Sequence, residues 1–148
     1  RVEPLGKVGI ANAKLTYQDW QELQASPRWK ALSAKGGRPQ RLLWASTSVK
    51  DKAYDALMYA EALMGPQTVD TLPPAVMQEL IKRGQGAPRL SEGLAEAHKT
   101  LEALQQADIS IDSVCQALLD EGLASFEKSF GALMGAIERQ RLSLQGSH

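Results

Sequence analysis

Apolar positions recur every three or four residues along most of the chain, which is the spacing that lines one face of a helix. The clearest case near the N-terminus is residues 6–23, whose apolar face consists of Ile10, Ala13, Tyr17 and Trp20. Ser26-Pro27 should end this helix, because the residue before a proline is disfavoured in the helical region. A further helical turn at residues 28–34 is expected before a glycine-containing loop at 35–39.

Two short segments break the helical pattern. Residues 41–46 contain an apolar run without alternation, which is typical of a strand covered on both faces in a parallel sheet. Residues 68–72 resemble a second short strand, and a helix over about residues 52–64, capped by Asp51, is expected between the two. The order of strand, helix, strand and helix predicts two parallel strands joined by a crossover connection.

Three further helices are expected toward the C-terminus. Pro73-Pro74 opens the first, because proline is tolerated in the first turn of a helix. Ser91 is expected to cap the second, whose apolar face consists of Leu94, Ala97, Leu101 and Leu104. Asp112 is expected to cap the last, and Gly122 leaves open whether it is one helix or two. We expect Cys115 to face the core and the following residues to form a packed apolar face: Phe126, Phe130, Leu133 and Ile137.

Two short parallel strands do not make a stable sheet by themselves, because both faces and both edges need covering. One interpretation is an all-helical interaction domain without catalytic activity, in which residues 41–46 are a buried helix segment. The other is that the remaining strands belong to an N-terminal part of the same protein. The length of 148 residues suits one domain, and we favour the second interpretation, since the sequence starts at Arg1 rather than at methionine.

Composition excludes several classes of function. Lysine and arginine together number 17, as do aspartate and glutamate, so the net charge is zero and neither nucleic acid nor an anionic membrane is an expected partner. Apolar runs are too short to span a membrane. Cys115 is the single cysteine, which excludes an internal disulfide and fits the cytoplasm. With two histidines far apart and one cysteine, we expect no metal site.

Several segments, in one order and with matching spacings, resemble the C-terminal part of transaldolases of the longer bacterial type. They are Gly6–Tyr17, Arg38–Thr47 with Lys50 and Tyr54, Gly65–Pro74 and Gly122–Lys128. Trp44-Ala-Ser-Thr together with Thr68-Val-Asp-Thr-Leu-Pro is more specific than either stretch alone. The resemblance implies an α/β fold in which residues 1–148 form the C-terminal portion of a TIM (β/α)8 barrel. Residues 41–46 and 68–72 would be its seventh and eighth strands.

The resemblance also implies an activity. Transaldolases transfer a dihydroxyacetone unit between sugar phosphates in the pentose phosphate pathway, through a Schiff base on a lysine of the fourth strand. That lysine-bearing segment is absent from this sequence, so we expect no catalytic residue here, no cofactor, and no activity of the isolated chain. The implied partners are sugar phosphates, the N-terminal part of the same protein and, as an open alternative, a second copy. A fused isomerase domain downstream, as some family members have, also stays open.

The candidate chemistry lies where residues 41–46 end. There the apolar run passes directly into Ser46, Thr47 and Ser48, and Lys50 follows. Hydroxyl groups, backbone N–H groups at the start of the next helix and a lysine all suit a phosphate, and barrels of this kind commonly bind phosphate after the last two strands. We therefore predict a substrate phosphate site formed by Ser46, Thr47, Ser48 and Lys50. In shorter family members an arginine stands where this chain has Ser48, and Lys50 is the expected substitute.

Simpler interpretations stand beside these. Ser46 would also serve as a helix cap, and Lys50 as a solvated loop lysine. Trp44 is expected in the core rather than as a stacking surface for a sugar, and His98 is expected to be exposed. Asp70, within the second predicted strand, is a weak candidate for a general acid, because alternation does not determine which face of the sheet it occupies.

Overall fold

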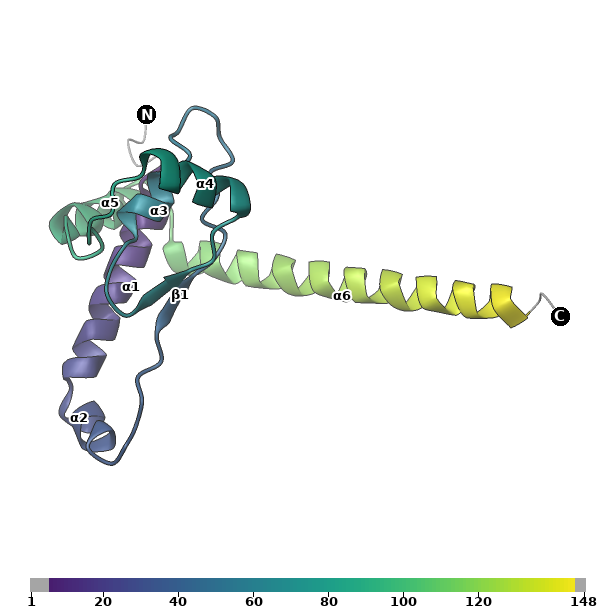
Figure 1. The fold of residues 1–148 in the computed structure, drawn as a ribbon, viewed down its shortest axis with the longest axis horizontal. Helices are drawn as coiled ribbons and strands as arrows, with labels where there is room; N and C mark the ends of the chain where they lie inside the picture. The colour runs from purple at the N-terminus through teal and green to yellow at the C-terminus, as the bar shows by residue number, and fades with distance from the viewer. Residues whose placement is uncertain (1–5, 146–148) are drawn as a thin grey trace. The chain divides into compact units, whose positions relative to one another are not determined.

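The computed structural model describes residues 6–145, which are mostly helical with two short strands. The elements in chain order are α1 (Val8–Ala25), α2 (Pro27–Ser33), β1 (Leu42–Trp44), α3 (Met58–Ala62), β2 (Thr68–Asp70), α4 (Pro74–Arg83), α5 (Leu94–Gln106) and α6 (Ile111–Gln145) (Figure 1). They form two compact units, one up to Ala107 and one from Asp108 onward.

The two strands pair in parallel, as their order along the chain predicts. Leu42 lies opposite Thr68, Leu43 opposite Val69, and Trp44 opposite Asp70. Residues 42–44 are thus extended, which excludes the helical alternative for this segment. Because the strands are parallel, their carboxyl ends lie at the same edge of the sheet, where Trp44 and Asp70 stand side by side.

Helices α1 and α5 lie side by side in the first unit (Figure 1). The helix predicted for residues 6–23 is observed as α1. Tyr17, on its predicted apolar face, is 2% exposed. Tyr17 joins Leu63 and Leu90 in a buried cluster, against which Leu42 and Trp44 of β1 pack. Trp44 is half-buried and packs against this cluster, but it also lines a cavity, so the choice between a core residue and a stacking surface stays open.

A second buried cluster connects α3 with α4. Leu57, Ala60 and Val76 form it, and Leu72 and Leu80 pack against it. Leu57 is 1% exposed although it only precedes α3, because the loop after β1 turns inward at this point. The two clusters together hold β1 and the connection between the strands, and no residue of either strand is fully buried.

Three helix starts differ from prediction, and in each case a local hydrogen bond or backbone conformation explains it. The helix expected over residues 52–64 is only Met58–Ala62, because Asp51 and Asp55 each accept a backbone N–H two residues later, from Ala53 at 2.9 Å and from Leu57 at 2.7 Å. Such side-chain bonds stabilise turns in competition with a helix.

The other two differences are caps. Gly93, with a positive φ of 67°, directly precedes α5, so Ser91 does not cap it. At the last helix the Ser110 hydroxyl oxygen accepts the Ser113 N–H at 3.2 Å, so Ser110 takes the capping role predicted for Asp112.

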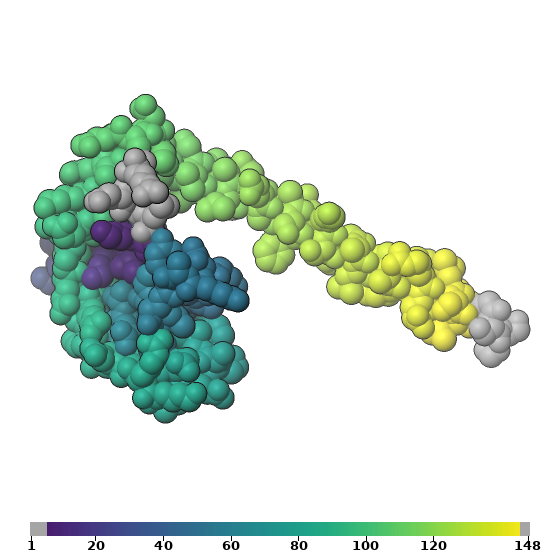
Figure 2. All heavy atoms as spheres, turned by 90° about the horizontal axis from the view of Figure 1, so that it is seen from above, coloured from purple at the N-terminus to yellow at the C-terminus, as the bar shows by residue number. Residues whose placement is uncertain are grey.

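The second unit contains one long helix, α6, which continues through Gly122 without a break. Figure 2 shows its side chains, coloured green to yellow, along its whole length. Its apolar seam repeats at alternating steps of four and three residues, and every member is more than half exposed: Leu119, Leu123, Phe126, Phe130, Leu133 and Ile137. The packing predicted for the Phe126–Ile137 face is therefore not found within residues 6–145. The prediction that Cys115 faces the core is wrong, because this cysteine is exposed.

Candidate functional site

The loop that follows β1 is joined to the end of β2 by backbone contacts. The Thr71 backbone N–H donates to the Trp44 carbonyl oxygen at 3.1 Å, and the Thr71 hydroxyl approaches the same oxygen at 3.3 Å. These bonds continue the strand pairing one residue past β2. They place the hydroxyl-rich segment after Trp44 directly beside Asp70 and Thr71.

A cavity of about 680 Å³ lies at this edge. All four predicted site residues line it, namely Ser46, Thr47, Ser48 and Lys50. The rest of its wall comes from β1, the N-terminal part of α1 and two tyrosines, with the lining residues Gly6, Gly9, Ala13, Leu43, Trp44, Ala45, Val49, Asp51, Tyr54, Tyr59 and Leu63. The structure therefore brings the predicted residues together around one space. The tyrosines were not predicted as part of it.

Thr47 differs from its neighbours in being buried. Its side chain is 4% exposed, and its hydroxyl donates to the Asp70 carboxylate oxygen Oδ1 at 2.8 Å. That hydroxyl hydrogen is thus already used, so a phosphate would meet a different group of this residue. Ser46 and Lys50 are exposed and Ser48 is half-buried, which leaves their side chains accessible.

Asp70 is half-buried at the end of β2. Removal of the carboxylate from water raises its pKa above the ordinary value, while hydrogen bonds from Thr47 and from the Thr71 backbone act in the opposite direction. No positively charged side chain among residues 6–145 contributes to the shift of the Asp70 pKa. Sequence reasoning did not predict the hydrogen bond from Thr47 to Asp70.

Ser46 adopts a left-handed backbone conformation, with φ of 57°. This region is disfavoured for residues other than glycine, asparagine and aspartate, and costs roughly 1 kcal/mol. Strained backbone of this kind is often found at ligand-binding positions. The strained residue and the buried Thr47 are adjacent, so the chain turns sharply just where the cavity begins.

The structure corrects one part of the predicted site. The start of the next helix was expected to donate backbone N–H groups to the phosphate. Helix α3 begins at Met58, well beyond Lys50, and comprises only 5 residues. The segment between them is a turn in which the Tyr54 N–H donates to the Asp51 carbonyl at 3.2 Å. The N-terminus of α3 therefore does not contribute positive charge at this edge, whereas the ammonium group of Lys50 does.

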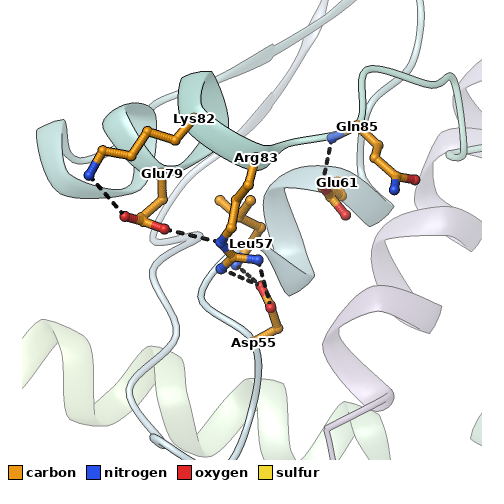
Figure 3. A network of polar contacts seen from close by, with 7 residues as sticks. All are labelled: Asp55, Leu57, Glu61, Glu79, Lys82, Arg83 and Gln85. Atoms are coloured by element: carbon orange, nitrogen blue, oxygen red, sulfur yellow. Dashed lines mark hydrogen bonds and ion pairs between the residues drawn. The ribbon is translucent and has the colours of Figure 1, made fainter.

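Polar contacts join the C-terminal end of α4 to the residues at both ends of α3 (Figure 3). Arg83, the last residue of α4, donates to both carboxylate oxygens of Asp55, at 2.9 and 3.1 Å, and its Nε donates to Glu79 at 3.0 Å. The Gln85 backbone N–H donates to the Glu61 carboxylate at 2.8 Å. The Arg83 guanidinium lowers the pKa of Asp55, and the neighbouring carboxylates raise that of Arg83. The network joins the end of α4 to both ends of α3.

Other chemistry is sparse in residues 6–145. They contain no group of three or more histidine, cysteine, aspartate or glutamate side chains arranged to hold a metal ion. No helix in this part of the chain is long and apolar enough to cross a membrane. His98 is exposed, as expected. Lys14 lies in α1, where its Nζ donates to the Glu92 carbonyl oxygen at 2.7 Å and so helps to join α1 to the segment before α5.

A mostly helical chain with two parallel strands, and a cavity at the carboxyl end of β1, is consistent with part of an α/β protein. Comparison with known proteins gives the family. Residues 2–137 match the family model described as Transaldolase/Fructose-6-phosphate aldolase. The chain therefore belongs to the transaldolase/fructose-6-phosphate aldolase family, and the resemblance seen in the sequence is confirmed.

Individual relatives agree with this assignment. The chain is 47% identical over 135 residues to "Transaldolase 2" of Nostoc sp. (strain PCC 7120), an alignment that covers 90% of this chain and 35% of that protein. It is 44% identical over 137 residues to "Transaldolase" of Trichodesmium erythraeum, covering 91% of this chain and 36% of that protein. "Transaldolase" of Frankia alni is 40% identical over 135 residues, with 90% and 36% covered. The chain thus spans about a third of the length of these relatives.

Proposed function

We propose that this chain forms the phosphate-binding end of a cytoplasmic transaldolase, an enzyme that transfers a dihydroxyacetone unit between sugar phosphates in the pentose phosphate pathway. Residues 1–148 contribute the C-terminal part of a single (β/α)8 barrel domain. In this assignment β1 is the seventh strand and β2 the eighth. The transaldolase names of the relatives and the parallel pairing of the two strands support the proposal.

The observation that carries it is the shared cavity at the carboxyl end of β1. Ser46, Ser48 and Lys50 all line this cavity, so two hydroxyl groups and an ammonium group border the same space. Hydroxyl and ammonium groups are donors without a negative charge, which is the combination that binds a phosphate. Active sites of (β/α)8 barrels lie at this end of the strands, and phosphate commonly binds after the last two.

Exposed apolar surface supports a partner that completes the barrel. Both strands are only 3 residues long, and within residues 6–145 each pairs with the other alone. The apolar seam of α6 is also uncovered in these residues. A solvent-exposed apolar patch of this extent marks an interaction site. We assign the N-terminal part of the same protein as the partner, because the alignments cover only 35–36% of the length of these relatives.

The catalytic lysine of the proposed enzyme lies in that N-terminal part. A lysine that forms a Schiff base needs a desolvated site that lowers its pKa. Lys50 is exposed, and Lys14 uses its ammonium group in a contact with Glu92. Neither residue has the environment that the chemistry requires.

A kinetic experiment tests the phosphate site in the full-length enzyme. Ser46→Ala should raise the KM for sugar phosphates about tenfold, the effect of losing one hydrogen bond to a charged group. Lys50→Gln should weaken competitive inhibition by inorganic phosphate to a similar or larger extent. Lys52→Gln is the matched control, because Lys52 is exposed in the same loop but does not line the cavity. Unchanged phosphate inhibition in both test variants would remove the site from this loop.

A trapping experiment tests the location of the lysine. Borohydride reduces a Schiff base to a stable secondary amine, so full-length enzyme incubated with a ketose phosphate donor and borohydride should carry a covalent three-carbon adduct. Proteolysis and mass spectrometry should find that adduct outside residues 1–148. An adduct on Lys14 or Lys50 would contradict the proposal that the catalytic lysine lies in the N-terminal part of the protein.

A further inference from the structure

Asp70 is the residue of this edge for which the proposed function supplies no role. It ends β2 and stands opposite Trp44 in the strand register, so it lies next to the start of the loop that contains Ser46, Thr47, Ser48 and Lys50. Its carboxylate accepts the Thr47 hydroxyl at 2.8 Å, across a sequence separation of 23 residues. This bond connects the two strand ends through side chains, in addition to the backbone bond between Thr71 and Trp44.

The partner of Asp70 is the buried centre of the loop. Thr47 is 4% exposed, whereas Ser46 before it is exposed and Ser48 after it is half-buried. A side chain fixed inside the protein determines the backbone position at that residue, and therefore the positions from which its two neighbours extend. Ser46 in addition has the left-handed φ of 57°, a conformation that persists only where its surroundings enforce it.

We propose that Asp70 is a positioning residue of the phosphate site, which holds Thr47 inside so that Ser46 and Ser48 border the cavity. This inference rests on the proposed function, because it assigns a residue to the same site. Asp70 does not touch the phosphate in this arrangement. It acts through the hydroxyl of Thr47 and the backbone of the loop.

The chemistry of the site indicates that Asp70 serves as a hydrogen-bond acceptor rather than as a charge. A carboxylate beside a phosphate site repels the ligand, so its negative charge gives no advantage. Burial also disfavours the ionised form of this group. An asparagine side chain offers an oxygen of similar shape without the charge. The proposal therefore predicts that asparagine replaces Asp70 with little loss, and that a residue without an acceptor does not.

The test uses paired variants of the full-length enzyme, with inorganic phosphate as a competitive inhibitor and a sugar phosphate as substrate. Asp70→Leu and Thr47→Val remove one partner each at nearly constant size, and each should raise the phosphate Ki and the substrate KM by about tenfold, with kcat changed less than about threefold. Asp70→Asn and Thr47→Ser keep the hydrogen bond and should stay within about twofold of the wild type. The double variant Asp70→Leu/Thr47→Val should be no worse than either single one, because both remove the same interaction.

Thr71→Val provides a matched control. The Thr71 hydroxyl also spans the two strands, through the Trp44 carbonyl at 3.3 Å, but Thr71 does not line the cavity. Its loss should leave the phosphate Ki unchanged. If Asp70→Leu does not fold, Thr47→Val carries the test alone, since it alters a neutral side chain.

The possible outcomes separate this inference from the proposed function. Phosphate inhibition that weakens in Ser46→Ala and Lys50→Gln but not in Asp70→Leu or Thr47→Val overturns the positioning role and leaves the phosphate site in place. Phosphate inhibition that is unchanged in Ser46→Ala and Lys50→Gln overturns the site itself. Equal loss in Asp70→Asn and Asp70→Leu shows that the charge is needed, and also overturns the inference. A fall in kcat without a change in KM or Ki would mean a structural role only.

Discussion

The ring of Tyr54 lies against Gly6, at the entrance to α1 and beside the cavity. A Cβ on Gly6 would come within 2.9 Å of the Tyr54 Cε1 atom, and the φ of Gly6 is +79°, so both space and backbone conformation require glycine here. Tyr54 belongs to the loop after β1, and Gly6 lies two residues before the start of α1. The close contact therefore joins two of the segments that line the predicted phosphate site.

Gly6→Ala should destabilise the chain by roughly 1–2 kcal/mol from the left-handed conformation alone, with a further contribution from the contact with Tyr54. Combining it with Tyr54→Ala should recover the contact part but not the conformational part. Urea unfolding followed by circular dichroism measures both. Gly86→Ala is the control, because Gly86 has no neighbour within 4 Å of the added methyl group and no positive φ. Equal effects of the two glycine substitutions would contradict the packing described for Gly6.

Ser46 allows the hydroxyl group to be separated from the backbone conformation. Ser46→Gly and Ser46→Ala both remove the hydroxyl, but glycine adopts the φ of 57° without strain and alanine does not. Ser46→Gly should therefore be the more stable variant by roughly 1 kcal/mol in thermal unfolding. Both variants should lose phosphate affinity in the full-length enzyme. Wild-type affinity in Ser46→Gly would show that the loop conformation, and not the hydroxyl, determines binding.

The ion pair between Arg83 and Asp55 predicts a pH dependence of stability. Arg83 lowers the pKa of Asp55, so the folded state binds this proton less tightly than the unfolded state does. The stabilisation is thus present above the ordinary pKa of aspartate and is lost as the pH falls through the lowered one. Arg83→Gln should raise the Asp55 pKa in an NMR titration and reduce stability at neutral pH but not in strong acid. The effect is expected to be small because both groups are exposed.

Lys82→Gln is the matched control for this pair. Lys82 neighbours Arg83 and pairs with Glu79 at 3.5 Å, but has no hydrogen bond to Asp55 among the described contacts. Its replacement should leave the Asp55 titration unchanged. A shift of that titration as large as in Arg83→Gln would mean that general surface charge, rather than the two hydrogen bonds, lowers the pKa.

The apolar seam of α6 predicts opposite results in two contexts. Phe126 and Phe130 are 79% and 65% exposed, so Phe126→Ser/Phe130→Ser should leave the unfolding of the isolated chain almost unchanged while reducing its binding of a hydrophobic dye. In the full-length protein, where we propose that the seam is covered, each substitution should cost about 3–5 kcal/mol. Calorimetry of the isolated chain and of the full-length protein, each with and without the substitutions, measures both effects. Equal stability of the full-length variant and its parent would mean that the seam stays exposed there.

Helices whose signals are local were predictable from the sequence. The run of Ser26-Pro27 separates α1 from α2 as expected, and Pro74 opens α4. Helix α3 was overestimated because the apolar period continues through residues 52–57 while the side chains of Asp51 and Asp55 bond to the backbone instead. Periodicity detects the apolar face of a segment. It does not show whether a nearby side chain, such as that of Asp51 or Asp55, accepts a backbone N–H and so prevents the helix from forming.

The grouping of Ser46, Thr47, Ser48 and Lys50 was predictable because the four residues are consecutive or nearly so at a strand end. The bond between Thr47 and Asp70 was not, since all three residues of β2 are half-buried and alternation gives no preferred face. The exposure of Cys115 and of the α6 seam has a similar origin. A repeating apolar pattern identifies a surface that can be buried, but the partner that buries it lies beyond the pattern.

In the phosphate site that we propose, the hydrogen bond between Thr47 and Asp70 affects both the affinity and the rate of ligand binding. A loop that is already ordered loses little conformational entropy when it binds an anion, so more of the interaction energy contributes to affinity. Association should then proceed as encounter with a ready-made receptor, with a rate set mainly by diffusion and charge rather than by loop rearrangement.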